Sequence, residues 1–122
     1  MAEISGSNHL QNDFKCPHCG TEITAGIGFR AGVVKDLNYK LGDKLDWSGK
    51  RTWPNERPAD GNFKTIGYFE CENIRCETWN DCYPDVQEVV IEIENDIIRK
   101  MNLVSYQPNK IEFPVFSLDQ EI

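Results

Sequence analysis

The sequence has no long hydrophobic run. Its longest aliphatic stretch is Val89-Val90-Ile91, whereas a membrane-spanning helix needs about 20 apolar residues. The polar residues 1–13 also lack the basic and apolar regions of a signal peptide. We therefore expect no membrane partner and a cytoplasmic location, where thiols stay reduced and clustered cysteines bind metal more often than they form disulfides.

Histidine is also scarce, with only His9 and His18 among 122 residues. A Cys–His nucleophile pair would have to use His9 from the polar N-terminal segment or take His18 from between two cysteines. The sequence contains no H-x-E or H-E-x-x-H element and no phosphate-binding loop. We therefore expect a protein that is not an enzyme.

The composition favours a small core with much loop. Hydrophobic residues make up 39% of the chain, which also has nine glycines and six prolines. At 122 residues it fits one domain, and a domain with a thin core usually needs a further staple, which the five cysteines can supply. The net charge of −7 disfavours nucleic acid as a partner, because it would repel phosphate backbones.

Apolar and β-branched residues are spaced as in strands over much of the chain. Three segments show this pattern: residues 21–41, 63–70 and 86–94, the last alternating with glutamates. Residues 97–104 fit the second strand of a hairpin, which we favour, or a short helix. The pattern predicts a β-rich fold, all-β or α+β, made of antiparallel strands.

The chain divides into a tail and one domain. Residues 1–13 are polar and are expected to form a flexible N-terminal tail. Residues 14–122 are expected to form the domain. Within it, residues 43–62 lack periodicity and predict a long irregular loop, which at this length is either functional or mobile.

The five cysteines fall into two groups. Cys16 and Cys19 are two residues apart, a spacing that lets both sulfurs reach one tetrahedral metal ion. A closed structural zinc site takes four ligands. We predict one structural Zn²⁺ held by Cys16, Cys19, Cys71 and Cys76, with Cys82 as the alternative fourth ligand.

The segment Cys16-Pro17-His18-Cys19-Gly20 resembles the CPxCG knuckle of zinc-ribbon proteins. In that family a second cysteine pair on another hairpin faces the first across the metal. The resemblance implies a zinc-ribbon-like site, in which Gly20 supplies the positive backbone angle of the turn. It extends loosely over residues 68–76 and departs from the family in the Cys71-x4-Cys76 spacing. His18 is interpreted as a solvated knuckle residue.

A redox function of the same two cysteines is the alternative to zinc binding. Cys-Pro-His-Cys is also the active-site tetrapeptide of some thioredoxin-fold oxidants, in which the first cysteine begins a helix that lowers its pKa. The residues after Cys19 are poor helix formers, and no βαβ pattern surrounds them. A thiol-dependent redox protein that uses Cys16 and Cys19 is therefore the less favoured alternative.

The long loop combines aromatic and cationic residues, which are typical of interaction surfaces. The candidate binding residues are Trp47, Lys50, Arg51, Trp53 and Arg57. Such residues form protein hot spots and also stacking platforms for single-stranded nucleic acid. We favour a non-enzymatic, zinc-stabilised module that binds another protein. The alternative is a nucleic-acid-binding ribbon that uses residues 39–64.

A second candidate surface is the acidic strand at residues 86–94. Small acidic proteins can neutralise basic partners, such as nuclease toxins, through charge complementarity. The expected partner is thus a protein at either surface.

Overall fold

The computed structural model describes residues 7–11, 15–16, 19–23, 26–69, 87–103 and 113–120. These ranges are β-rich, as expected. Within them, no helix is long and apolar enough to cross a membrane. Their elements are β1 Asn8–Leu10, β2 Ile27–Phe29, β3 Gly32–Val33, β4 Asn38–Tyr39, β5 Thr52–Trp53, the 3-10 turn η1 Ala59–Gly61, β6 Phe63–Phe69, β7 Gln87–Glu94, β8 Ile97–Leu103 and β9 Val115–Phe116.

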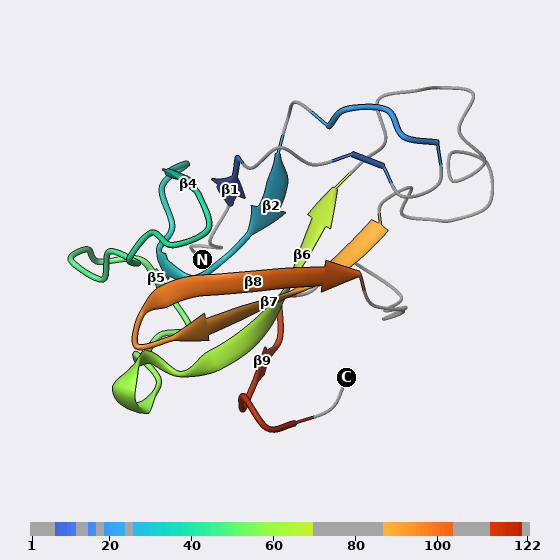
Figure 1. The fold of residues 1–122 in the computed structure, drawn as a ribbon. Helices are drawn as coiled ribbons and strands as arrows, with labels where there is room; N and C mark the ends of the chain where they lie inside the picture. Colours follow the sequence, from blue (N-terminus) through green and yellow to red (C-terminus); the bar gives the residue numbers. More distant parts are fainter. Residues whose placement is uncertain are drawn as a thin grey trace.

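Most of the described strands belong to one curled sheet (Figure 1). Its order is β4-β1-β2-β6-β7-β8, with β9 joined to β6, while β3 and β5 form a separate two-stranded sheet. Neighbouring strands run antiparallel except β1 and β4, which run parallel. The expectation of a purely antiparallel sheet is therefore wrong at this edge, where β1 inserts between β2 and β4.

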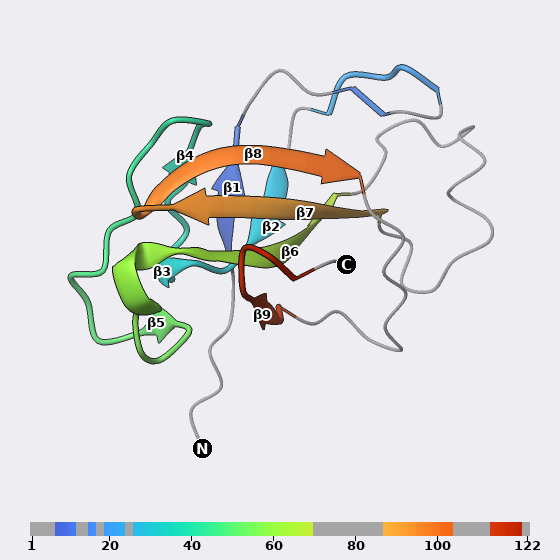
Figure 2. The ribbon, with the colours of Figure 1, turned by 60° about the horizontal axis from the view of Figure 1, so that its bottom comes forward.

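The two ends of this strand order are tied together. Lys44, shortly after β4, forms a β-bridge with Ile97 at the start of β8. The Gly42 N–H donates to the Ile98 carbonyl at 2.7 Å, and the Ile98 N–H donates to the Asp43 carbonyl at 3.0 Å. These bonds curl the sheet towards a barrel (Figure 2).

The hydrophobic core lies inside the curl. On β7, Val89, Ile91 and Ile93 are buried and alternate with residues that are half-buried or exposed, as the period of two predicts. Further core residues come from β1, β2, β6 and β8: Leu10, Ile27, Phe29, Phe63, Phe69 and Ile98.

The hairpin prediction for the segment after β7 is confirmed. Asn95 and Asp96 have φ values of 53° and 65°, which are the left-handed angles of a two-residue hairpin turn. β8 then pairs antiparallel with β7 as far as Leu103. The alternative of a short helix is wrong for these residues, because Ile98 and Met101 meet Ile93 and Ile91 across the ladder.

The expectation of a flexible tail is wrong for residues 8–10, which form β1. Asn8 is fully buried, and its amide donates to the carbonyls of Ala31 at 3.1 Å and Val33 at 2.9 Å. Its side-chain oxygen accepts the N–H groups of Lys35 at 3.3 Å and Leu37 at 3.1 Å. One polar side chain thus holds the bend before β4 against β1, with all its hydrogen-bonding capacity used.

Candidate functional site

The described residues before and after positions 17–18 are hydrogen-bonded to each other, which defines the turn around Cys16 and Cys19. Lys15 and Glu22 form an antiparallel bridge, and the Cys16 N–H donates to the Thr21 carbonyl at 2.8 Å. The Gly20 N–H donates to the Cys16 carbonyl at 2.8 Å. Gly20 has a φ of +77°, and a Cβ added to it would meet nothing within 4 Å, so the glycine is required by the backbone angle and not by lack of space. The positive angle predicted for Gly20 is confirmed.

The two cysteines of this turn have different surroundings. Cys16 is only 2% exposed and belongs to the core cluster. Cys19 is exposed, and its thiol lies 3.2 Å from the hydroxyl of Thr21. The turn therefore places one thiol in the core and the other at the surface.

The geometry of the turn bears on the redox alternative. In redox pairs of the Cys-x-x-Cys type, a helix that begins at the first cysteine lowers its pKa. Here Thr21 and Glu22 continue into a β-bridge, and the described residues around the pair contain no helix. The helix that such redox pairs use is therefore absent from the described residues around Cys16 and Cys19.

The remaining predicted ligands, Cys71, Cys76 and Cys82, lie outside the described residues, as does His18. Among the residues that are described, no group of three or more histidine, cysteine or acidic side chains could hold a metal ion. The structure thus places Cys16 in the core and Cys19 at the surface of the same turn, and the zinc site stays a prediction.

The loop at residues 43–62 is largely irregular, as predicted, but is anchored by its own side chains. The Trp47 indole donates to Asp96 Oδ1 at 3.0 Å. The Arg57 guanidinium donates to both oxygens of the same carboxylate, with Nε at 3.0 and 3.1 Å and Nη2 at 2.8 Å. We call Asp96, Trp47 and Arg57 the Asp96 cluster. It joins both halves of the loop to the β7–β8 turn.

Asp96 is suited to this role by position and burial. It is 7% exposed, its N–H donates to the Gly61 carbonyl at 3.0 Å, and its carbonyl accepts the Leu45 N–H at 2.7 Å. The hydrogen bonds from Arg57 hold the pKa of the Asp96 carboxyl below its ordinary value; burial opposes this shift, and the bond from Trp47 adds to it. The carboxylate therefore stabilises the fold in its ionised form.

Trp53 anchors a different part of the chain. Its indole donates to the Phe113 carbonyl at 2.7 Å. The Arg30 guanidinium carbon lies 5.9 Å from the Trp53 ring centroid and 4.6 Å from that of Phe113, within the range of a cation–π contact. Both tryptophans of the loop are thus half-buried and bonded, and neither is presented as an exposed ring.

The other two predicted binding residues, Lys50 and Arg51, are exposed. They lie between Trp47 and Trp53 in the sequence, so an exposed cationic tip is flanked by two anchored indoles. Of the five candidate binding residues, Trp47, Trp53 and Arg57 contact other parts of the protein through their side chains. Lys50, Arg51 and Arg57 are exposed.

The acidic strand β7 is largely balanced by cations of its neighbour β8. Lys100 Nζ lies 3.6 Å from Glu92, and Arg99 Nε lies 4.0 Å from Glu94. Glu88 is half-buried, and burial raises the pKa of its carboxyl. This face offers a basic partner less unopposed negative charge than the sequence indicates.

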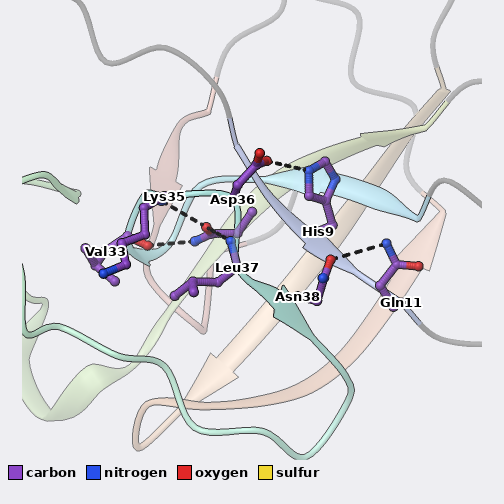
Figure 3. A network of polar contacts seen from close by, with 8 residues as sticks. His9, Gln11, Val33, Lys35, Asp36, Leu37 and Asn38 are labelled. Atoms are coloured by element: carbon purple, nitrogen blue, oxygen red, sulfur yellow. Dashed lines mark hydrogen bonds and ion pairs between the residues drawn. The ribbon is translucent and has the colours of Figure 1, made fainter.

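Some residues of structural importance were missed by sequence reasoning. His9, which the sequence places in a tail, lies on β1 with its Nε2 atom 2.9 Å from Asp36 Oδ1 (Figure 3). Asp96 was expected only as a turn residue, and Arg30 was not singled out. Each depends on a partner far away in the sequence, so no local signal identifies it.

Comparisons of the chain with protein-family models, with curated proteins and with solved structures found no match.

Proposed function

We propose that this chain is a non-enzymatic protein-interaction module stapled by one structural zinc ion. The observation that supports the zinc is the turn around Cys16 and Cys19, which is held by a β-bridge, two backbone hydrogen bonds and Gly20 at positive φ. Two cysteines at this spacing can supply two of the four ligands of a tetrahedral thiolate site.

The ion would be held by Cys16, Cys19, Cys71 and Cys76, with Cys82 as the alternative to Cys76. When bound, zinc supplies no reaction here; it cross-links segments that are far apart in the sequence, and its binding energy becomes folding energy. Because Cys16 is packed in the core, such a cross-link would join the second cysteine group to the core.

The binding surface of this proposal is the tip of the anchored loop, residues 48–51. Trp47 on one side is fixed to Asp96, and Trp53 on the other is fixed to Phe113. A loop that is already held loses less conformational entropy when it binds, which favours affinity. With Lys50 and Arg51 exposed at the tip, the complementary partner surface is acidic.

Nucleic acid is the second candidate partner, and the same two exposed cations favour it. Two observations count against it. Both indoles of the loop make hydrogen bonds to the protein and are half-buried, whereas single-strand binding uses exposed aromatic rings. The net charge of −7 also opposes binding to phosphate backbones.

Charge reversal at the tip tests the proposal. The double variant Lys50→Glu/Arg51→Glu should lose partner capture from extracts of the native host while keeping its stability. The matched control Lys35→Glu/Lys40→Glu makes the same charge change at exposed residues outside the loop and should retain capture. Nuclease treatment separates a protein partner, which survives it, from a nucleic acid. Equal capture by both double variants would contradict the assignment of the tip.

A further inference from the structure

The C-terminal segment lies along part of one side of β6 (Figure 1, Figure 2). β6 pairs with β7 along its whole length, but its other side is shared between two partners. Near its end, Tyr68 faces Gly28 of β2. Near its start, Lys64 and Thr65 face Phe116 and Val115 of β9. The first part of this side therefore receives a strand from the C-terminal segment.

The body of the protein holds this segment mainly through its backbone carbonyls. The Trp53 indole donates to the carbonyl of Phe113 at 2.7 Å, and the Thr65 hydroxyl donates to that of Pro114 at 2.8 Å. Lys64 Nζ donates to the carbonyl of Gln120 at 2.9 Å. Every extended peptide carries carbonyls such as those of Phe113 and Pro114, so Trp53 and Thr65 recognise an extended chain and not one particular sequence. The Gln120 carbonyl follows a turn, in which the Gln120 N–H donates to the Ser117 carbonyl at 3.1 Å.

The preference for an aromatic side chain in the docked segment comes from the contacts of the Phe113 ring. The Phe113 ring packs edge-on against Tyr68, with centroids 5.7 Å apart and planes at 89°. The Arg30 guanidinium lies over the same ring at 4.6 Å. These contacts favour an aromatic side chain at this position. The residue that follows is Pro114, whose missing N–H is tolerated on an edge strand.

The segment is held over a short stretch. The β9–β6 ladder has two residue pairs, Lys64 with Phe116 and Thr65 with Val115, whereas β6 and β7 share seven. Val115 is 39% exposed, so it adds little buried apolar area. A strand with so few ladder bonds and so little burial is drawn from the low-stability end of a structure and is expected to open locally.

We propose that this side of β6 is a strand-docking edge for an extended segment of a partner protein in which an aromatic residue is followed by proline. We call Arg30, Trp53, Lys64, Thr65 and Tyr68 the docking edge. Residues 113–116 are its resident occupant, and the partner segment displaces them. This inference deepens the proposed protein-binding function by naming the chemistry of a partner, and it does not depend on the zinc ion.

A peptide with the sequence of residues 113–120, Phe-Pro-Val-Phe-Ser-Leu-Asp-Gln, tests the proposal by fluorescence anisotropy with the full chain. Binding should be saturable, and a scrambled peptide should not bind. Phe113→Ala in the protein weakens the resident strand and should tighten peptide binding about tenfold, because a larger fraction of molecules is competent to bind. Should that variant not fold, Val115→Gly, which lowers the strand propensity of the resident strand at an exposed position and leaves the docking edge unchanged, should tighten it about twofold.

Trp53→Phe in the Phe113→Ala background removes the donor to the peptide and should weaken binding about fivefold, the equivalent of one hydrogen bond. A peptide with alanine in place of its first phenylalanine should also lose affinity. Equal binding of both peptides, or binding of neither, overturns the proposal. Dimerisation of the chain in sedimentation velocity, with no binding of the peptide, also overturns it, because the edge would then exchange strands only between copies.

A negative peptide result would leave the zinc measurement and the charge-reversal capture at Lys50 and Arg51 standing. Loss of capture in the charge-reversal variant with normal peptide binding would show two separate surfaces and support the edge independently of the loop tip.

Discussion

The Asp96 cluster and the Cys16–Cys19 turn both hold irregular chain in a fixed shape, but by different means. Asp96 is buried and receives bonds from Trp47 and Arg57, so its cluster is complete within the described residues. The cysteine turn fixes its own backbone and places the Cys19 thiol at the surface. The side chains of the first region bind one another, whereas the second region leaves the Cys19 side chain exposed.

The side chains of the loop and of the cysteine segment have other roles than their composition suggests. Tryptophan and arginine in a long loop resemble a binding surface, yet Trp47 and Arg57 serve to attach the loop to the β7–β8 turn. A short Cys-x-x-Cys segment has little to bury, yet the described residues before and after positions 17–18 are hydrogen-bonded to each other. Aromatic and cationic residues therefore indicate a contact, but only their partners show whether that contact lies within the chain or outside it.

The largest loss of unfolding free energy should come from replacing Cys19, the cysteine that is not packed in the core. Cys19 is exposed, so Cys19→Ser should cost less than about 0.5 kcal/mol if the thiol binds no metal. If it binds structural zinc, the variant should lose the metal and more than about 2 kcal/mol of unfolding free energy. Urea denaturation with parallel metal analysis measures both quantities. Thr21→Ala, which removes only the neighbouring hydroxyl, is the matched control and should keep the zinc.

The fourth ligand is tested by the second cysteine group. Cys76→Ser should lower zinc retention far more than Cys82→Ser, because the short segment from Cys71 to Cys76 resembles a knuckle. Retention against a competing chelator ranks the two variants. The opposite ranking would show that the site closes through Cys82.

The Asp96 cluster should show the next largest effect. Asp96→Asn retains a residue type that tolerates the φ of 65°, so it isolates the loss of charge. Losing the charge and one of the two oxygens that accept from Arg57 should cost about 2 kcal/mol of unfolding free energy. Asp36 is the control position. It also has a positive φ, of 64°, but its side chain is 80% exposed in its pair with His9.

For that exposed pair, Asp36→Asn should cost less than about 0.5 kcal/mol. Equal losses in the two variants by urea denaturation would contradict the structural role given to the Asp96 cluster.

A smaller effect is expected from pH. The folded-state pKa of Asp96 lies below its unfolded value of about 3.9. Its contribution to stability is therefore present above that value and is lost as the pH falls through the folded-state pKa. Glu88 has the opposite shift, because burial raises its pKa. The unfolding free energy of Asp96→Asn should consequently fall less steeply below pH 4 than that of the wild type; identical slopes would contradict this account.

The features that could be predicted from the sequence depend on neighbours along the chain. Alternation of apolar residues and glutamates identified β7, the Asn95-Asp96 turn identified the hairpin, and Gly20 followed from the cysteine spacing. In each case the deciding residues are at most a few positions apart. Backbone angles and side-chain periodicity are local properties, so the sequence carries them directly.

The features that were missed depend on distant partners. Asn8 looks like a tail residue because its hydrogen bonds go to residues 31–37. Asp96 becomes a buried anchor only when β8 brings it to Trp47 and Arg57. A polar residue is ordinarily exposed, and composition cannot show that a tertiary contact has satisfied it. The parallel pairing of β1 with β4 was missed for the same reason.

The metal content of the wild-type chain tests the central claim most directly. Native mass spectrometry of protein purified under reducing conditions should show one zinc ion per chain, and its removal by a chelator should reduce the hydrogen-exchange protection of the curled sheet, since zinc binding and folding are coupled. A metal-free chain with the same protection in β6, β7 and β8 would contradict the account and show that the cysteine turn is not half of a zinc site.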